Sequence, residues 1–117
     1  MKEEYRAKFS DVCDDLGWTF NHYGDEYELE KVSPAGEDFI IYVAENDFAG
    51  DLRRQADDFD EDEHVAMWVQ ARASGDYYAN RSIPPVKELV EDAAAIKAML
   101  CELAEAIEKA KEECDNE

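Results

Sequence analysis

The chain has 117 residues, 45% of them hydrophobic, and its 31 acidic and 12 basic side chains give a formal net charge of −19. This hydrophobic content excludes a wholly disordered chain, and the length predicts one domain spanning residues 1–117. The charge excludes direct binding to nucleic acid or to an anionic membrane, because both are repelled by it.

The cysteines and the hydrophobic pattern together predict a cytoplasmic protein. Cys13, Cys101 and Cys114 are an odd number with no close pair, which is typical of reduced thiols. No run of about 18 apolar residues is present to span a membrane. The opening segment MKEEYRAKF has charges where a signal peptide needs apolar residues.

The first 45 residues predict one helix and three strands. Apolar side chains share one helical face over residues 3–16, and Gly17 can end that helix in a left-handed conformation. Alternating aromatic and polar residues predict a hairpin over 18–32, turning at Gly24 and Asp25. After the Pro/Gly-bearing turn at 33–38, the most apolar segment, 39–45, is expected to be the central strand. A meander order would instead leave it at an edge of the sheet.

Three helices are expected in the second half. Asn46 or Asp47 can cap the first, which has four inward positions. The next helix starts at the acidic run, and the third follows a loop over 74–85. The inward positions are Phe48, Leu52, Ala56 and Phe59 in the first helix, and Val65, Trp68 and Val69 in the second.

The last helix is expected to begin near Pro85 and to reach Cys114, with residues 114–117 as a frayed tail. Apolar residues recur in it at alternating steps of three and four, as in a heptad seam. The seam residues are Val86, Leu89, Ala93, Ile96, Leu100, Leu103, Ile107, Ala110 and Cys114. A straight helix of this length spans roughly 45 Å. It exceeds a compact domain of about 35 Å, so we expect it to overhang or to meet a partner.

These elements predict an α+β domain of order α-β-β-β-α-α-α, in which a three-stranded antiparallel sheet packs with helices. The seam has two interpretations. Val90, Met99 and Ala104 widen it as in a globular core helix, which favours packing inside the chain. Its C-terminal part favours a homodimer instead, through Leu100, Leu103, Ile107 and Ala110.

The segment DDFDEDEHVAMW at 57–68 places six carboxylates just before an apolar stretch. A calcium loop of the EF-hand type fails, because Glu63 stands where glycine is needed and Val69 where glutamate is needed. Asp60 as N-cap, with Glu63 three residues later, fits a helix start. This leaves Asp57 and Asp58 unexplained, except as solubilising charge.

Enzymatic chemistry has little support in the sequence. Neither His22 nor His64 has a cysteine or aspartate at the spacing of a nucleophile or zinc site. We expect His64 to be solvated and His22 to be partly buried on a strand face. The sequence therefore predicts no catalytic residue, no metal and no cofactor.

The charge pattern is more informative. Carboxylates repeated along rigid elements resemble the phosphates of a nucleic-acid strand, and such a row can occupy a basic DNA- or RNA-binding groove. The cleanest row is Glu26, Glu28 and Glu30, which alternates with Tyr27 and Leu29. The predicted partner-binding residues are Asp57, Asp58, Asp60, Glu61, Asp62 and Glu63, followed by Glu26, Glu28 and Glu30.

The segments SPAGEDF, FDEDEHVAMWVQAR and ELVEDAAAIKAML resemble small acidic proteins of unknown function from phages and mobile elements of Firmicutes. No catalytic residue transfers with this resemblance. It implies, by analogy, a nucleic-acid mimic that inhibits a host restriction or CRISPR nuclease. The alternative hypothesis is a small interaction protein that self-associates through its last helix and uses its charge for solubility.

Overall fold

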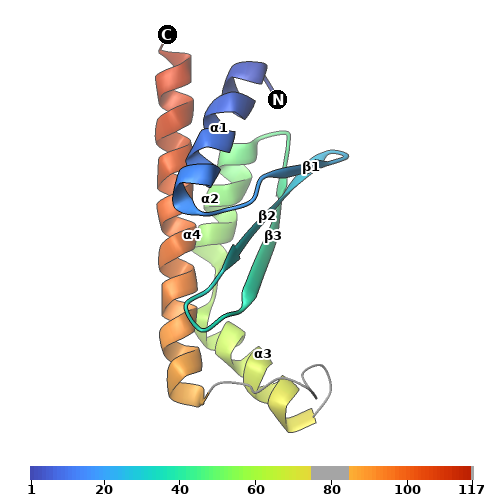
Figure 1. Cartoon of the computed structure of the whole chain (residues 1–117), viewed down its shortest axis with the longest axis vertical. Coiled ribbons are helices and arrows are strands. Elements are labelled where there is room, and N and C mark those ends of the chain that lie inside the picture. Colours follow the sequence, from blue (N-terminus) through green and yellow to red (C-terminus); the bar gives the residue numbers. More distant parts are fainter. Residues whose placement is uncertain (75–84, 117) are drawn as a thin grey trace.

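The computed structural model describes residues 1–74 and 85–116, and it confirms the predicted α+β class and element order. The expected loop at 74–85 falls almost entirely outside the described residues. Figure 1 shows the elements: α1 (Glu3–Leu16), β1 (Asn21–Tyr23), β2 (Glu26–Val32), β3 (Asp38–Ala44), α2 (Phe48–Asp58), α3 (Glu61–Ser74) and α4 (Val86–Asp115). None of the helices in these residues combines the length and hydrophobicity of a membrane span.

The three strands form an antiparallel meander in the order β1-β2-β3. The prediction that 39–45 is the central strand is therefore wrong, because β2 is central and β3 lies at an edge. The apolar character of β3 has another cause. Phe39, Ile41 and Val43 face the helices and are buried, whereas Ile40 and Tyr42 are exposed on the opposite face.

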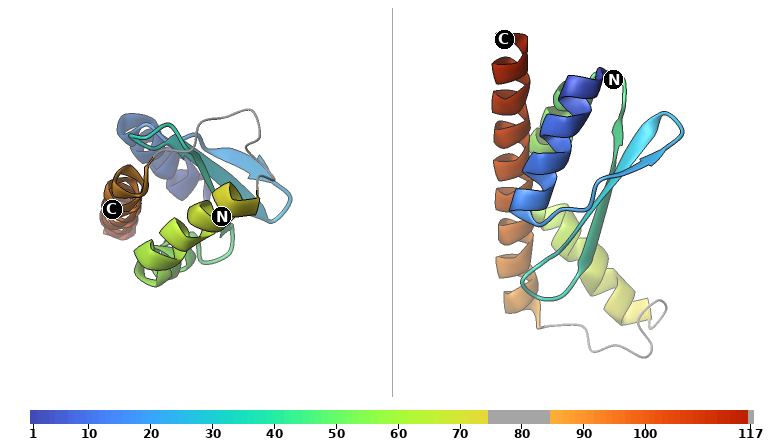
Figure 2. Two further views of the ribbon diagram at one scale, coloured as in Figure 1. Left: turned by 90° about the horizontal axis from the view of Figure 1, so that it is seen from below. Right: turned by 45° about the horizontal axis from the view of Figure 1, so that its top comes forward.

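All the described helices that pack on the sheet do so from one side (Figures 1 and 2). Tyr27 and Leu29 on β2 point into this layer and are fully buried. Phe9 on α1 stacks on Phe48 of α2, and the Tyr27 ring packs edge-on against the same phenylalanine. The core therefore lies between the helices and one face of the sheet, and the described residues leave the other face open.

The long helix does not overhang a compact body, so that expectation is wrong. The domain is elongated, with extents of 52 × 25 × 22 Å, and α4 runs along its long axis (Figure 1). Helices α1, α2 and α3 each pack against α4, at its C-terminal part, its middle and its N-terminal part respectively. Buried side chains consequently extend along α4 from Leu89 to Ala110.

The heptad seam of α4 is buried in the protein's own core from Leu89 to Ala110, whereas Val86 at its start is exposed. Leu100, Leu103, Ile107 and Ala110, predicted for self-association, are all buried against the chain's own helices. A second subunit would have to displace α1 or α2 to reach them. Helix α4 ends at Asp115, where the Asp115 carboxylate accepts hydrogen bonds from Tyr5 and Lys111.

Helix ends agree with the sequence in part. Gly17 ends α1 with a φ of 83°, as predicted, and the Trp18 amide donates to the Cys13 carbonyl at 2.7 Å. Asp47 precedes α2 but makes no side-chain cap, because its backbone is left-handed (φ 63°) rather than extended, and its carboxylate pairs with Arg54 at 3.3 Å. Pro85 is the N-cap of α4 rather than its first residue. In α3, Val69 is exposed rather than inward.

Truncating the centre of the α4 seam tests its role as core. Leu103→Ala should lower the free energy of unfolding by about 2–5 kcal/mol, because Leu103 is 0% exposed and the change leaves a cavity. Val90→Ala on the same helix, where Val90 is 52% exposed, should change it by less than about 0.5 kcal/mol. Denaturant unfolding measures both. A Leu103→Ala protein of unchanged stability but halved mass in light scattering would instead support the dimer seam.

Candidate functional site

The acidic run lies where α2 meets α3. Asp57 and Asp58 are the last residues of α2, and Asp60 caps α3 by accepting the Glu63 amide at 3.0 Å. All six carboxylate side chains are exposed. Five of them, Asp57 to Asp62, surround an open hollow of about 360 Å³ together with Phe59. The predicted role of Asp60 as the N-cap of this helix is thus confirmed.

Two basic side chains explain how α2 tolerates acids at its end, where the helix dipole disfavours them. The Lys97 ammonium donates to the carbonyls of Ala56 and Asp57 and so closes the end of α2. Arg53 pairs with Asp57 at 3.5 Å and binds Glu108 of α4 through two bonds of 2.6 and 3.0 Å. Its hydrogen bonds hold the pKa of Glu108 below the usual value.

The other acidic group, Glu26, Glu28 and Glu30, lies on the open face of β2. Alternate side chains of a strand point to opposite faces, and the intervening Tyr27 and Leu29 are buried, so the three glutamates share the open face. Residues two apart on a strand lie about 6.8 Å from each other. Lys31, the nearest cation in sequence, points away and donates to the Leu16 carbonyl at 2.7 Å.

The nine predicted acids do not form a single strip. Phe59, within the acidic run, packs edge-on against Phe39, whose side chain faces the helical layer. The acidic run therefore lies on the helical side of the sheet, whereas the glutamates of β2 point the other way. A partner with one flat contact surface can use one of the two groups, so the groups must be tested separately.

A buried polar cluster that the sequence analysis missed ties the β2–β3 turn to α4. Asp92 is 6% exposed, and its carboxylate accepts bonds from the Ser33 hydroxyl at 2.8 Å and the Ala35 amide at 2.9 Å. The Ser33 oxygen in turn accepts the Glu37 amide at 3.0 Å. A signal was present, because Asp92 places a carboxylate within the apolar stripe of α4, next to Ala93.

The two histidines are placed opposite to expectation. His64, expected to be solvated, has a side chain only 13% exposed, contacts Phe59, and lies 3.1 Å from both Glu37 carboxylate oxygens. Its burial follows from Phe59 and Phe39, which fold the start of α3 onto the sheet. His22, expected to be partly buried, is exposed at the short edge strand β1 and stacks on Tyr27.

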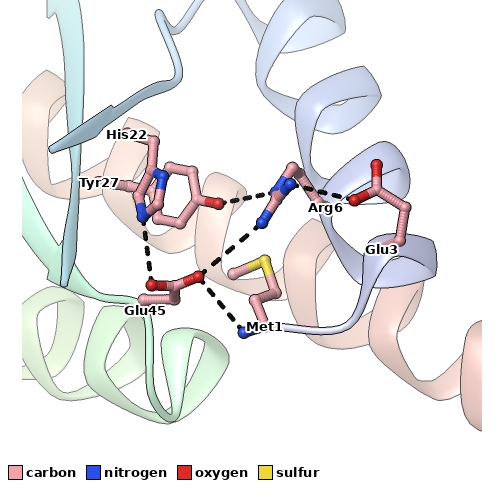
Figure 3. Close-up of polar contacts among 6 residues, drawn as sticks. All are labelled: Met1, Glu3, Arg6, His22, Tyr27 and Glu45. Atoms are coloured by element: carbon pink, nitrogen blue, oxygen red, sulfur yellow. Dashed lines mark hydrogen bonds and ion pairs between the residues drawn. The ribbon is translucent and has the colours of Figure 1, made fainter. Parts of the chain in front are cut away.

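Figure 3 shows the polar contacts around His22. Its imidazole lies 3.2 Å from Glu45, and this hydrogen bond is the main cause that lowers the pKa of the Glu45 carboxyl. The Glu45 carboxylate also faces Arg6 at 3.9 Å and the Met1 amino group at 3.3 Å. Arg6 donates to the Tyr27 hydroxyl at 3.1 Å. These contacts join α1 to β1 and to the end of β3.

The described geometry offers little for covalent chemistry. The Ser33 hydroxyl donates to the Asp92 carboxylate, and neither histidine lies within hydrogen-bond distance of it in the described residues. Burial raises the pKa of the Cys13 thiol to about 12, which keeps it protonated near neutral pH. In residues 1–74 and 85–116, no three His, Cys, Asp or Glu side chains converge as metal ligands would.

Comparison of the chain with protein-family models, with curated proteins and with solved structures finds no match. The resemblance to acidic phage proteins therefore stays an interpretation of the sequence. Charge and geometry of this chain are the basis for assigning a function.

Removing the Asp60 cap tests whether this carboxylate serves the fold. Asp60→Ala should lower the free energy of unfolding by about 1 kcal/mol, because the Glu63 amide loses its partner. Asp58→Ala makes the same change of charge without breaking a cap and serves as the control. Circular dichroism during urea unfolding compares the two. Equal stability of both variants would contradict the structural role of Asp60.

Removing the buried Asp92 carboxylate tests the cluster at the β2–β3 turn. Asp92→Ala should cost about 2–3 kcal/mol, because the Ser33 hydroxyl and the Ala35 amide both lose a charged acceptor. Glu91→Ala, an exposed neighbour with the same charge, should stay within about 0.5 kcal/mol of wild type. Thermal unfolding of the two variants gives the comparison, and similar losses in both would exclude a specific role for Asp92.

Proposed function

We propose that this protein is a non-enzymatic acidic binding protein that mimics nucleic acid and occupies the basic surface of a DNA- or RNA-binding protein. One observation supports this proposal above the others. Of the nine carboxylates predicted to bind a partner, only Asp57 forms an ion pair within the described residues. The other eight keep their charge available to a partner.

This availability matters because charges that are already paired contribute little to an encounter with another protein. Arg53, Arg54 and Lys111 pair with Glu108, Asp47 and Asp115, which are not among the predicted nine. Unpaired carboxylates on a chain of net charge −19 attract a basic surface over a distance and speed its association. They also repel nucleic acid, so protein and nucleic acid compete for one basic site.

The spacing of Glu26, Glu28 and Glu30 on β2 is a second argument for the proposal. This spacing of about 6.8 Å is comparable to the separation of successive phosphates along a nucleic-acid strand. Sheet pairing on both sides of β2 holds the row in place, so its attachment to the backbone is rigid. Self-association through Leu100, Leu103, Ile107 and Ala110 is the less favoured hypothesis, because these side chains lie in the chain's own core.

Retention of proteins from a cell lysate tests the proposal. Immobilised protein should retain nucleic-acid-binding proteins, and about 0.5 M salt should release them, because salt screens exposed charges. Soluble duplex DNA should release the same proteins at low salt, since it competes for the basic site. Gel electrophoresis and mass spectrometry identify the released proteins.

The matched control neutralises seven acids without altering the core, by changing Glu26, Glu28, Glu30, Asp58, Glu61, Asp62 and Glu63 to their amides. This variant should retain none of these proteins. Retained proteins that resist both salt and DNA, or that bind the neutralised variant equally well, would contradict nucleic-acid mimicry.

A further inference from the structure

The open face of the sheet combines charge with exposed aromatic surface. The row of Glu26, Glu28 and Glu30 runs along its central strand. Large apolar side chains flank the row, with exposed fractions of 60% for Tyr23, 57% for Val32, 41% for Ile40 and 54% for Tyr42. A solvent-facing sheet surface is normally polar, and apolar side chains gathered on one face mark interaction sites.

The strand register places each tyrosine beside a glutamate. Tyr23 of β1 is opposite Glu26, and Tyr42 of β3 is opposite Glu28. Side chains opposite each other in an antiparallel pair have Cβ atoms about 4.5–5.5 Å apart. The two rings therefore flank the row from its two sides, each next to a carboxylate, while Glu30 lies opposite Ile40.

The side chains of Tyr23 and Tyr42 have no bonding partner within the described part of the chain. No ring contact, cation or side-chain hydrogen bond is found on the side chains of Tyr23 or Tyr42 there, and Glu26, Glu28 and Glu30 form no ion pair. Tyr5 provides the contrast, since the ammonium groups of Lys2 and Lys111 lie 5.4 and 5.5 Å from its ring centroid. The aromatic faces on the sheet are free to accept a cation from outside.

We infer that the open sheet face is the contact surface of this protein and that it binds an arginine-rich segment of a basic protein. The inference rests on the proposed function, from which it takes the basic nature of the partner. It goes further by naming the surface of this protein that makes the contact and arginine as the partner side chain that it recognises. A planar guanidinium donates two parallel bonds to a carboxylate and stacks on an aromatic ring. A lysine ammonium meets the carboxylate but offers no plane to stack.

Other occupants fit this face less well. Nucleic acid can stack on tyrosine, but the three carboxylates repel its phosphates. A second copy of this chain would oppose two rows of glutamates, and an apolar partner would bury three charges without partners. Charge complementarity thus selects a cationic segment, and the adjacent rings select arginine.

The state of the two sheet edges favours binding of the partner segment across the open face, rather than its pairing with an edge as an additional strand. The Gln55 amide of α2 donates to the Tyr42 carbonyl at 2.8 Å, and Asp51 accepts the Ala44 amide at 2.9 Å. These two bonds occupy outward-facing backbone groups of β3. The other edge strand, β1, has three residues, which is short for strand addition.

Two peptides test the inference: one of nine residues with arginine at every second position and serine between, and its lysine counterpart of equal charge. Fluorescence anisotropy at low salt should show the arginine peptide binding about fivefold or more tightly, because only the planar guanidinium can bond a carboxylate through two parallel bonds and stack on a tyrosine ring. Tyr23→Ala/Tyr42→Ala should bring the two affinities within about twofold of each other.

Charge variants separate the two acidic groups. Glu26→Gln/Glu28→Gln/Glu30→Gln should weaken binding of both peptides by about tenfold or more. The matched control, Glu61→Gln/Asp62→Asn/Glu63→Gln, removes the same charge from the acidic run and should weaken it by about threefold at most. Circular dichroism and thermal unfolding confirm that all the variants are folded, as expected for substitutions at solvent-facing positions.

Three results would overturn the inference: equal affinity for the two peptides, a greater loss in the control triple variant, or tighter binding of a single-stranded oligonucleotide than of the arginine peptide. These results are independent of the lysate experiment. If DNA fails to displace the retained proteins from the lysate, nucleic-acid mimicry is contradicted, but arginine binding by the open sheet face is not. If the peptides instead bind at the acidic run, the open sheet face is not the contact surface, but nucleic-acid mimicry is not contradicted.

Discussion

The burial of one stripe along α4 is the interaction on which the rest of the structure depends. Ile96, Leu100, Leu103 and Ile107 are almost completely buried, and three other helices pack against the same helix. Each fully buried aliphatic side chain stabilises the fold by about 1.5–3 kcal/mol. A chain with net charge −19 needs this continuous core, because the repulsion among its carboxylates opposes compaction.

The arrangement of the helices along α4 also determines which surfaces are available. Because α1, α2 and α4 lie on one side of the sheet, the described residues leave its other face open to solvent (Figure 2). Several basic side chains join elements, as Arg53 joins α2 to α4 and Lys97 closes α2. Within the described residues the glutamates of β2 form no ion pair, which is what a surface for a basic partner requires.

Polar contacts join the two ends of the sheet to the rest of the fold. Asp92 holds the β2–β3 turn against α4, and His64 with Glu37 joins the start of α3 to the same turn. Around the opposite end of the sheet, Arg6 contacts Tyr27, and Glu45 contacts His22 (Figure 3). The sheet is thus held at both ends from its covered side, and its open face needs no further support.

The sequence by itself determined the element order, the hairpin within residues 18–32, the Gly17 helix end and the Asp60 cap, because these depend on local periodicity and on side chains a few residues apart. It also identified the Glu26, Glu28 and Glu30 row, since alternation along a strand is local. Only the tertiary structure decided that β3 is an edge strand, that the α4 seam faces its own helices, and that His64 is mostly covered and His22 exposed. Only pairing with Tyr23 and Tyr42 made the glutamate row a composite surface, and Asp92 found its partners 57 and 59 residues away. Such outcomes depend on which segments meet in space, and this is set by the packing of the whole core rather than by any single segment.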